Sequence, residues 1–463
     1  MHAGPSLRVP VHRYELISCH DCGKLHRRHP LAPRQKARCV RCRSVLYRGI
    51  ASDANRMAAL VLGAALTFLI AQLFPIVKLE VNGLRSSATL LGAIRVLWNE
   101  NMQVVAAIVF LCTILLPAVE LGSLLYVTLS LRAGQQPPGL HRLLRAVRAA
   151  RHWGMTEVLM IGILITVVKM TSLAQVEPQA GLFAFGALTL MLAIVTAFDP
   201  RILWNLADEQ ARARGAALPA PATVLAGGVP TLTCHACGLV AEDRGQRQHQ
   251  HGHGQQHQYG HQHGHQHGQG NGNGNGQQRC ARCGAALHRR RPDSVARTWA
   301  LLLAAAILYI PANLLPVMYT HSLFGKEDDT IISGVIYFWH SGSPALAAII
   351  FIASIVVPVL KLAALSLLAW TAQRRSRWRP LQRTVLYRLV ELVGRWSMLD
   401  IFVITLTVAL VRFQTLAVIT AGPGALAFCA VVVLTMLASM QFDPRLIWDH
   451  LGANGENDGR NRP

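Results

Sequence analysis

Long apolar runs alternate with short polar stretches along most of the chain. A helix that crosses a hydrocarbon core of roughly 30 Å needs about 20 mainly apolar residues. The sequence predicts eight such spans, at 57–77, 103–131, 154–174, 180–200, 298–318, 343–371, 396–416 and 423–443. Two shorter apolar pieces, 89–98 and 330–339, each end near a Trp and are typical of re-entrant or interfacial half-helices.

The eight spans form two tandem copies of one four-span unit. Residues of the second copy repeat those of the first about 241 positions later: Pro75 and Pro316, Trp98 and Trp339, Pro117 and Pro358, Trp153 and Trp396. The copies close on Phe198-Asp199-Pro200-Arg201 with Trp204, and on Phe442-Asp443-Pro444-Arg445 with Trp448. A repeat of this length indicates two like modules in one polypeptide. Pro75 and Pro316 should kink or end the opening helix of each module.

The positive charge of the chain is concentrated in alternate loops. Of 463 residues only 15% are charged, yet the formal net charge is +22. The loop between the second and third spans carries Arg132, Arg142, Arg145, Arg148 and Arg151, and the loop between the sixth and seventh carries Arg374, Arg375, Arg377, Arg379, Arg383, Arg388 and Arg395. Residues 319–342 contain only Lys326 among Lys and Arg. Because cytoplasmic loops of membrane proteins are rich in Lys and Arg, both termini and both Arg-rich loops are predicted to be cytoplasmic. The bases lie beside apolar spans, without a recognition element, which argues against nucleic-acid binding.

Eight of the ten cysteines form paired C-x-x-C units, one set before each module. The first set is Cys19, Cys22, Cys39 and Cys42, and the second is Cys234, Cys237, Cys280 and Cys283. Two such turns close a tetrahedral four-sulfur site, so each set predicts a zinc ribbon, with iron as the alternative metal. Four protein ligands leave no open position, which favours a structural role. Cys112 and Cys429 fall within spans and are expected to be small apolar fillers.

The second ribbon carries an insert between its cysteine pairs. Residues 244–279 contain eight His among Gln, Gly and Asn. This composition predicts a disordered loop. Its imidazoles could capture a transition metal, or the insert is an expanded repeat without function.

Ionisable residues within spans are candidates for function because burying them in a membrane is costly. Glu120 aligns with Lys361, so the two copies carry opposite charges at one position. We expect these two residues to form an ion pair between the modules or a polar patch that lines a cavity. The third and seventh spans begin with Glu157 and Asp400 and end with Lys169 and Arg412. These four either contribute to the same site or complement helix dipoles and reach the membrane surface.

The sequence therefore predicts an all-α polytopic membrane protein in five segments. These are zinc ribbon 1 (1–56), transmembrane module 1 (57–200), a linker with zinc ribbon 2 (201–297), transmembrane module 2 (298–443) and a polar tail (444–463). No nucleophile–base constellation, phosphate-binding Gly loop or HExxH motif is present, so an enzyme is not expected. Asp199 and Asp443 are predicted to cap the chain locally where Pro stops the last spans.

The assembled pattern resembles the paraquat-inducible protein A family of the Gram-negative inner membrane. The motifs that carry the resemblance are the paired C-x-x-C ribbons, Pro311-Ala312-Asn313-Leu314-Leu315-Pro316, Trp396-Ser397-Met398-Leu399-Asp400 and the two Phe-Asp-Pro-Arg endings. The resemblance implies tetraspanin-type four-helix bundles that serve as a membrane base for periplasmic MCE-domain partners in lipid traffic. It also makes Asn313 a transport candidate. The His-rich insert departs from the family pattern.

The leading hypothesis is that the chain passes phospholipid between the inner membrane and an MCE-domain partner. Two alternatives stay open at this stage. The C-x-x-C pairs could cycle between thiol and disulfide in a membrane redox protein, or the His-rich insert could belong to a metal sensor or metal transporter.

Overall fold

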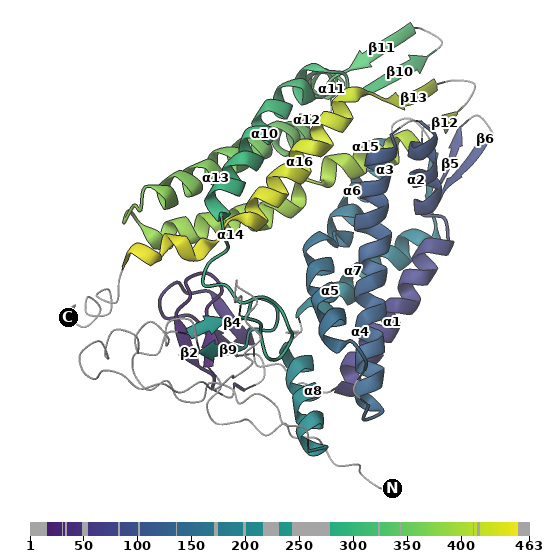
Figure 1. The fold of residues 1–463 in the computed structure, drawn as a ribbon. Helices are drawn as coiled ribbons and strands as arrows, with labels where there is room; N and C mark the ends of the chain where they lie inside the picture. The colour runs from purple at the N-terminus through teal and green to yellow at the C-terminus, as the bar shows by residue number, and fades with distance from the viewer. Residues whose placement is uncertain are drawn as a thin grey trace, which may run out of the picture. The chain divides into compact units, whose positions relative to one another are not determined.

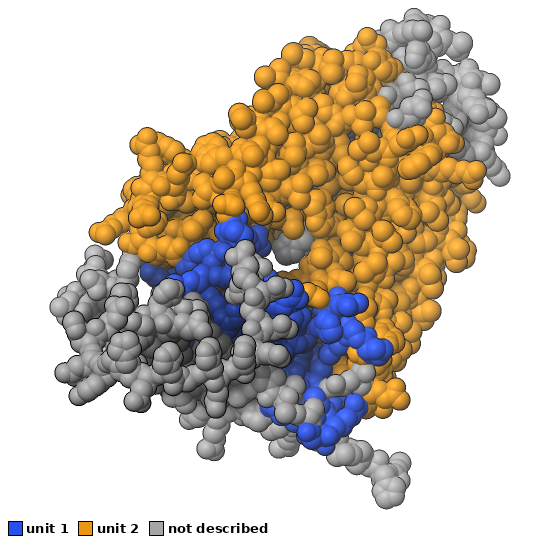
Figure 2. All heavy atoms as spheres, viewed as in Figure 1, with its two compact units in different colours: residues 1–52, 138–142, 199–292 blue, residues 53–137, 143–198, 293–463 orange. Residues whose placement is uncertain are grey.

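The computed structural model describes most of the chain between residues 16 and 451. The described ranges are 16–29, 31–32, 35–48, 54–81, 84–100, 102–135, 137–170, 175–197, 201–215, 231–242, 278–322, 325–342, 344–410, 412–413 and 417–451. Nearly all of the insert 244–279 lies outside them, as does most of the tail 444–463. The chain divides into two compact units (Figure 2): unit 1 comprises 1–52, 138–142 and 199–292, and unit 2 comprises 53–137, 143–198 and 293–463.

Unit 2 contains both membrane repeats (Figure 1). The helices of repeat 1 are α1 (Ala54–Leu73), α2 (Leu90–Asn99), α3 (Gln103–Phe110), η1 (Leu111–Leu115), α4 (Leu116–Arg132), α5 (Leu140–Trp153), α6 (Thr156–Met170) and α7 (Ala180–Ala197). Those of repeat 2 are α10 (Ser294–Leu314), α11 (Ile331–His340), α12 (Pro344–Phe351), η2 (Ile352–Val356), α13 (Val357–Gln373), α14 (Pro380–Trp396), α15 (Leu399–Leu410) and α16 (Pro423–Gln441). The two series match element for element, so the internal repeat of the sequence is a repeat of structure.

A helix lies at each of the eight predicted spans, and the predicted half-helices correspond to α2 and α11. In the part of the chain that the structure describes, six helical stretches are long and apolar enough to cross a membrane. The other two are shorter: α7 has 18 residues and α15 has 12. The prediction that the seventh span runs over 396–416 was therefore too long, because the chain leaves the helix after Leu410 and enters strand β12 (Arg412–Phe413). The protein is a mostly helical, multi-pass membrane protein.

Two π-helical turns interrupt equivalent helices of the two repeats. η1 joins α3 to α4, and η2 joins α12 to α13, each just before the proline at the second position of the next helix. Pro117 and Pro358 cannot donate a backbone hydrogen bond within the helix. A widened turn accommodates such a proline without breaking the helix. Each long span therefore continues as one rod past its proline.

Small antiparallel sheets join the spans at one end of each repeat, and the prediction of an all-α chain missed them. In repeat 1 the strand order is β6 (Leu84–Ala88), β5 (Val77–Val81) and β7 (Gln175–Pro178). In repeat 2 it is β11 (Gly325–Asp329), β10 (Met318–Ser322), β13 (Ala417–Ala421) and β12. Strands β5 and β10 follow Pro75 and Pro316, which end α1 and α10 as predicted. Each sheet thus ties the loop after the first span of its repeat to the loop after the third span.

The first and last spans of each repeat pack closely at this corner. The backbone N–H of Gly181 donates to the carbonyl of Pro75 over 3.0 Å, and that of Gly424 donates to the carbonyl of Pro316 over 2.9 Å. A Cβ atom at either glycine would lie 2.5 Å from a backbone carbonyl oxygen of the opening span. Glycine is therefore needed where α7 and α16 begin.

The two repeats share one hydrophobic core within unit 2. Helix α6 packs against α15, so the third span of one repeat contacts the third span of the other, and α2 also packs on α15. The core joins Leu159 and Ile163 of α6 to Phe402 of α15 and Phe428 of α16. Cys112 and Cys429 lie in the same core as apolar side chains. The repeats are therefore packed together in one body of structure.

Unit 1 contains the two cysteine ribbons and helix α8 (Arg201–Ala213). Ribbon 1 consists of two hairpins, β1 (Leu16–Ser18) with β2 (Leu25–Arg27) and β3 (Lys36–Arg38) with β4 (Val45–Arg48). Ribbon 2 pairs β8 (Thr231–Thr233) with β9 (Val240–Glu242), and a bridge between Arg279 and Ala286 holds its second turn. Strand β1 contacts β9, so the two ribbons touch.

Candidate metal centres and charged positions in the membrane helices

Four turns of the same geometry present the eight paired cysteines. In ribbon 1 the N–H of Cys19 donates to the carbonyl of Lys24 over 2.9 Å, and the N–H of Gly23 donates to Cys19 over 3.0 Å. The turns at Cys39, Cys234 and Cys280 repeat both bonds. The fourth residue after the first cysteine has positive φ in every turn: Gly23, Arg43, Gly238 and Gly284. This left-handed residue bends the chain so that both thiols of a pair point the same way.

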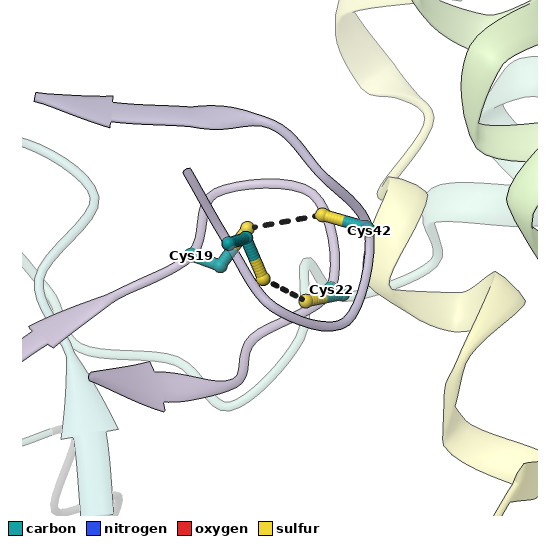
Figure 3. Close-up of side chains that lie close together, drawn as sticks. Cys19, Cys22 and Cys42 are labelled. Atoms are coloured by element: carbon teal, nitrogen blue, oxygen red, sulfur yellow. Dashed lines mark hydrogen bonds between the residues drawn. The ribbon is translucent and has the colours of Figure 1, made fainter. Parts of the chain in front are cut away.

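Each ribbon brings its four thiols together in the interior of the turn pair. Cys19 and Cys42 have their sulfurs 3.4 Å apart, and Cys22 and Cys39 3.5 Å apart (Figure 3). In ribbon 2 the same distances, Cys234 to Cys283 and Cys237 to Cys280, are 3.5 Å. All four sulfurs of each set lie within 4.8 Å of one another, and all eight residues are buried. A tetrahedral ion with metal–sulfur bonds of about 2.3 Å would place its sulfurs about 3.8 Å apart. Both clusters could therefore hold a metal ion.

Polar groups beside the first cluster support thiolate ligands. The hydroxyl of Ser44 lies 3.0 Å from the sulfur of Cys19, and Nε2 of His26 lies 3.2 Å from the sulfur of Cys39. Burial lowers the pKa of His26, so its ring is neutral near pH 7. A ring nitrogen that carries its proton on Nε2 can donate to a thiolate and stabilise it. His26 was missed in the sequence, although it follows Cys22 by four residues.

The thiols also act on one another. Hydrogen bonds from Cys19 and Cys22 lower the pKa of Cys42, and hydrogen bonds from Cys234, Cys237 and Cys283 lower the pKa of Cys280. The pKa of at least one thiol in each cluster is thus lowered by its neighbours, which favours the thiolate form that binds a cation. A dithiol redox enzyme needs one accessible C-x-x-C pair. Here both pairs of each cluster are buried, and the short sulfur–sulfur contacts join cysteines of different pairs.

Helix α8 is joined to the second ribbon by one arginine in the turn Cys280–Cys283. Arg282 forms an ion pair with Asp208 of α8 at 2.8 Å, and its guanidinium lies 5.4 Å from the ring centre of Trp204. Trp204 therefore anchors the ribbon to the helix that follows repeat 1. Its counterpart Trp448 acts differently: its indole N–H donates to the hydroxyl of Thr384 over 3.0 Å. Asp443 caps the turn as predicted, accepting from the N–H of Arg445 over 3.1 Å.

Within the membrane helices, Glu120 is buried on α4 and forms an ion pair in its own repeat. Nε of Arg151, on α5, donates to Oε1 of Glu120 over 2.8 Å, and the same guanidinium lies 3.4 Å from the carbonyl oxygen of Val195. The expectation of a direct pair between Glu120 and Lys361 was therefore wrong. The sequence assigned Arg151 to the cytoplasmic arginine cluster, because composition does not reveal which base of that cluster turns back onto the bundle.

Lys361 is the fifth residue of α13, as Glu120 is of α4, and it is only 3% exposed. Its Nζ has no hydrogen-bond partner among the residues that the structure describes. Its side chain lies over Gly394 of α14: a Cβ atom at that glycine would be 3.4 Å from Nζ. The two equivalent positions therefore differ in partner as well as in sign.

Of the remaining candidates, the structure describes the side chains of Glu157 and Asn313, and neither bonds to Glu120 or Lys361. Glu157 is exposed in the first turn of α6, and Asn313 donates to the carbonyl of Tyr309 on its own helix α10 over 2.8 Å. Lys169 lies at the end of α6, Asp400 at the start of α15 and Arg412 in β12, and the side chains of these three lie outside the described part of the structure. Asn313 thus makes a local contact within its own helix. The hydroxyl of Tyr309 in turn donates to the carbonyl oxygen of Ile355 in η2 over 3.3 Å.

Comparison with known proteins gives one consistent result. The paraquat-inducible protein A family matches residues 54–208 and 295–452, which are the two repeats. Over 440 residues the chain is 32% identical to the intermembrane transport protein PqiA of Escherichia coli K12, covering 95% of this chain and 96% of that protein. It is 29% identical over 451 residues to the lipophilic envelope-spanning tunnel protein A of the same organism, covering 95% and 93%.

A third relative is a probable intermembrane transport protein of Haemophilus influenzae, which is 27% identical over 453 residues, with 96% of this chain and 98% of the relative covered. No solved structure matches the chain significantly.

Proposed function

The chain belongs to the paraquat-inducible protein A family, and from this premise we propose that it is the membrane component of an intermembrane lipid transport system. The observation that carries the proposal is the match to intermembrane transport proteins over 95% of the chain, together with the family match over both repeats. The two repeats are apolar and contain a few buried charged side chains. Such a surface can contact both the acyl chains and the headgroup of a lipid. We assign no catalytic step to the chain.

We propose further that the protein lies in the bacterial inner membrane and works with a periplasmic MCE-domain protein. The name of one relative, an envelope-spanning tunnel protein, supports a partner that extends away from the membrane. The arginine-rich loops support cytoplasmic termini and cytoplasmic ribbons. The end of each repeat that carries a sheet would then face the periplasm and the MCE-domain partner.

We propose zinc as the metal of both clusters. Four buried thiols at near-tetrahedral separation suit zinc, and the absence of an open coordination position suits a structural ion. Metal binding would then contribute the folding energy of two ribbons that have very short strands. When bound, the ion would hold its two hairpins together, while the protein's own residues His26 and Ser44 orient the thiolates of the first ribbon.

Lipid transfer is the first test. A strain that lacks the protein and its relatives should become sensitive to detergent, and the full-length chain should restore resistance. Purified protein in a bilayer that contains a labelled phospholipid should pass the label to a soluble MCE-domain acceptor. A chain that restores resistance without any lipid transfer would remove the proposed function.

Orientation and metal have separate tests. A reporter that is active only in the periplasm should be silent when fused after Asp208 and active when inserted near Lys326, and the opposite pattern would reverse the topology. Elemental analysis should give two zinc ions per chain, and Cys39→Ser should leave one. Iron, or rapid titration of the thiols in the native protein, would contradict the structural zinc assignment.

A further inference from the structure

The same contact is made in both repeats, with different chemistry. In repeat 1 the fifth residue of α4, within the long second span, meets the following helix α5 through the pair Glu120–Arg151. In repeat 2 the corresponding contact is Lys361 with Gly394. Arg151 lies two residues before Trp153, which ends α5, and Gly394 lies two residues before Trp396, which ends α14. Repeat 2 therefore has Lys361 where repeat 1 has the acid Glu120, and the glycine Gly394 where repeat 1 has the cation Arg151.

The charge of this contact is balanced in repeat 1 and unbalanced in repeat 2. The carboxylate of Glu120 neutralises Arg151 at 2.8 Å. Lys361 is at least as buried, and no described residue accepts a hydrogen bond from its Nζ. An unpaired ammonium in an apolar span is costly, so it persists where an anion compensates it. Nζ is itself buried, and Gly394 leaves it without a side-chain neighbour at this position of α14, where a Cβ atom would lie 3.4 Å from Nζ.

The surroundings of Lys361 suit an amphiphile. Val359 and Leu360, which precede it on α13, are exposed apolar side chains. The second span is also less buried in repeat 2 than in repeat 1: in the most apolar part of Ala347–Gln373 22% of the residues are buried, against 44% in the equivalent stretch Gln103–Arg132. An apolar surface for acyl chains thus lies next to a buried cation that lacks a described partner.

We propose that the ammonium of Lys361, opposite Gly394, binds a phosphate-type anion, and that this anion is the phosphodiester of a phospholipid headgroup. The proposal rests on the proposed transport function and names the point at which the cargo is held. In repeat 1 the cation of this contact, Arg151, is already paired with Glu120, so repeat 1 would have a structural role. Repeat 2 would bind the phospholipid. A lysine suits this task because its ammonium is a compact charge with three donors for phosphate oxygens.

The test uses the full-length protein in phospholipid nanodiscs, with a photoreactive phenylalanine analogue in place of Leu360. Crosslinked phospholipid is measured by mass spectrometry in the otherwise unchanged chain, in Lys361→Met, and in the double variant Lys361→Glu/Gly394→Arg. The double variant transplants the ion pair of repeat 1, so it satisfies the charge while filling the site. Both variants should keep the metal content and the monodisperse behaviour of the parent. The yield of crosslinked phospholipid should fall roughly tenfold, as expected for the loss of one charge-assisted hydrogen bond.

Control probes identify the source of the anion. A diacylglycerol nanodisc component with the same acyl chains should crosslink weakly and independently of Lys361. Inorganic phosphate in excess should not reduce the phospholipid crosslink, and if it does the site binds a soluble anion and the lipid assignment is overturned. Full crosslinking or full transfer by the double variant would show that Lys361 is only a structural charge.

Failure of this inference differs from failure of the proposed function. If the parent crosslinks and transfers phospholipid and Lys361→Met does so equally well, the binding point is elsewhere and the function stands. If the parent neither crosslinks nor transfers phospholipid, the transport proposal itself is refuted.

Discussion

Removal of Arg151 should harm the protein more than removal of Glu120. The side chain of Glu120 is 6% exposed and that of Arg151 is 15% exposed, with 2.8 Å between the paired atoms. Arg151→Ala leaves a buried carboxylate without its cation, a change that costs about 3–5 kcal/mol. Glu120→Ala leaves a guanidinium that still has the carbonyl of Val195 nearby and is closer to water. We therefore expect a loss of about 1–3 kcal/mol for that variant.

The pair also predicts coupling. The double variant Glu120→Ala/Arg151→Ala should lose about 1–3 kcal/mol less than the sum of the single losses. Unit 2 has about 310 residues, for which 1 kcal/mol corresponds to roughly 1.5 °C, so Arg151→Ala should lower the apparent melting temperature by about 4–8 °C. The measurement is thermal unfolding of purified protein in detergent, and Arg142→Ala on the exposed side of α5 is the matched control. Additive losses, or a larger loss for Glu120→Ala, would refute the reasoning.

Three further outcomes are expected from the packing and the ribbons. Gly424→Ala should destabilise the protein by about 1–3 kcal/mol, because the new methyl group would lie 2.5 Å from the carbonyl oxygen of Leu315. The control is Gly334→Ala, whose methyl group meets nothing within 4 Å and which should be neutral or slightly stabilising in the same melting assay. Arg43→Gly should raise the metal affinity of ribbon 1 a few-fold in chelator competition, since Arg43 has a φ of 59° and glycine removes a strain of about 1 kcal/mol; an unchanged affinity would contradict this. His26→Ala should lower that affinity by roughly 10–100-fold while leaving ribbon 2 unaffected, and equal loss at both ribbons would argue against a local donor.

Features that depend on local chemistry could be predicted from the sequence. Proline at 75 and 316 ends the opening helices, and the residue spacing of the C-x-x-C turns gives the two cysteine clusters. The outer strands were missed although Val77-Lys78-Leu79-Glu80-Val81 alternates apolar and polar residues, the pattern of a strand. The pairing of this strand with β7, almost a hundred residues later, has no local signal.

Features that depend on which helix faces which could not be predicted. The opposite signs of Glu120 and Lys361 suggested that they meet, because the sequence gives the charge at each position but not its neighbour. The structure shows that each contacts the helix following its own span, where Arg151 and Gly394 decide the outcome. The two π-helical turns were likewise invisible, since a proline in a helix permits either a kink or a widened turn.

The packing of α6 on α15 restricts how the protein can move. A Cβ atom at Gly162 would lie 3.2 Å from Cβ of Phe402, so the glycine lets the Phe402 side chain pack directly on the backbone of α6. Transporters built from repeats commonly alternate between states by rocking one repeat against the other. In this protein such rocking would pull Phe402 out of a close-packed interior and expose it. Conformational change is therefore expected to cost less free energy within the second span of repeat 2, where fewer residues are buried, than across the seam between the repeats. A crosslink between α6 and α15 should be compatible with a working protein.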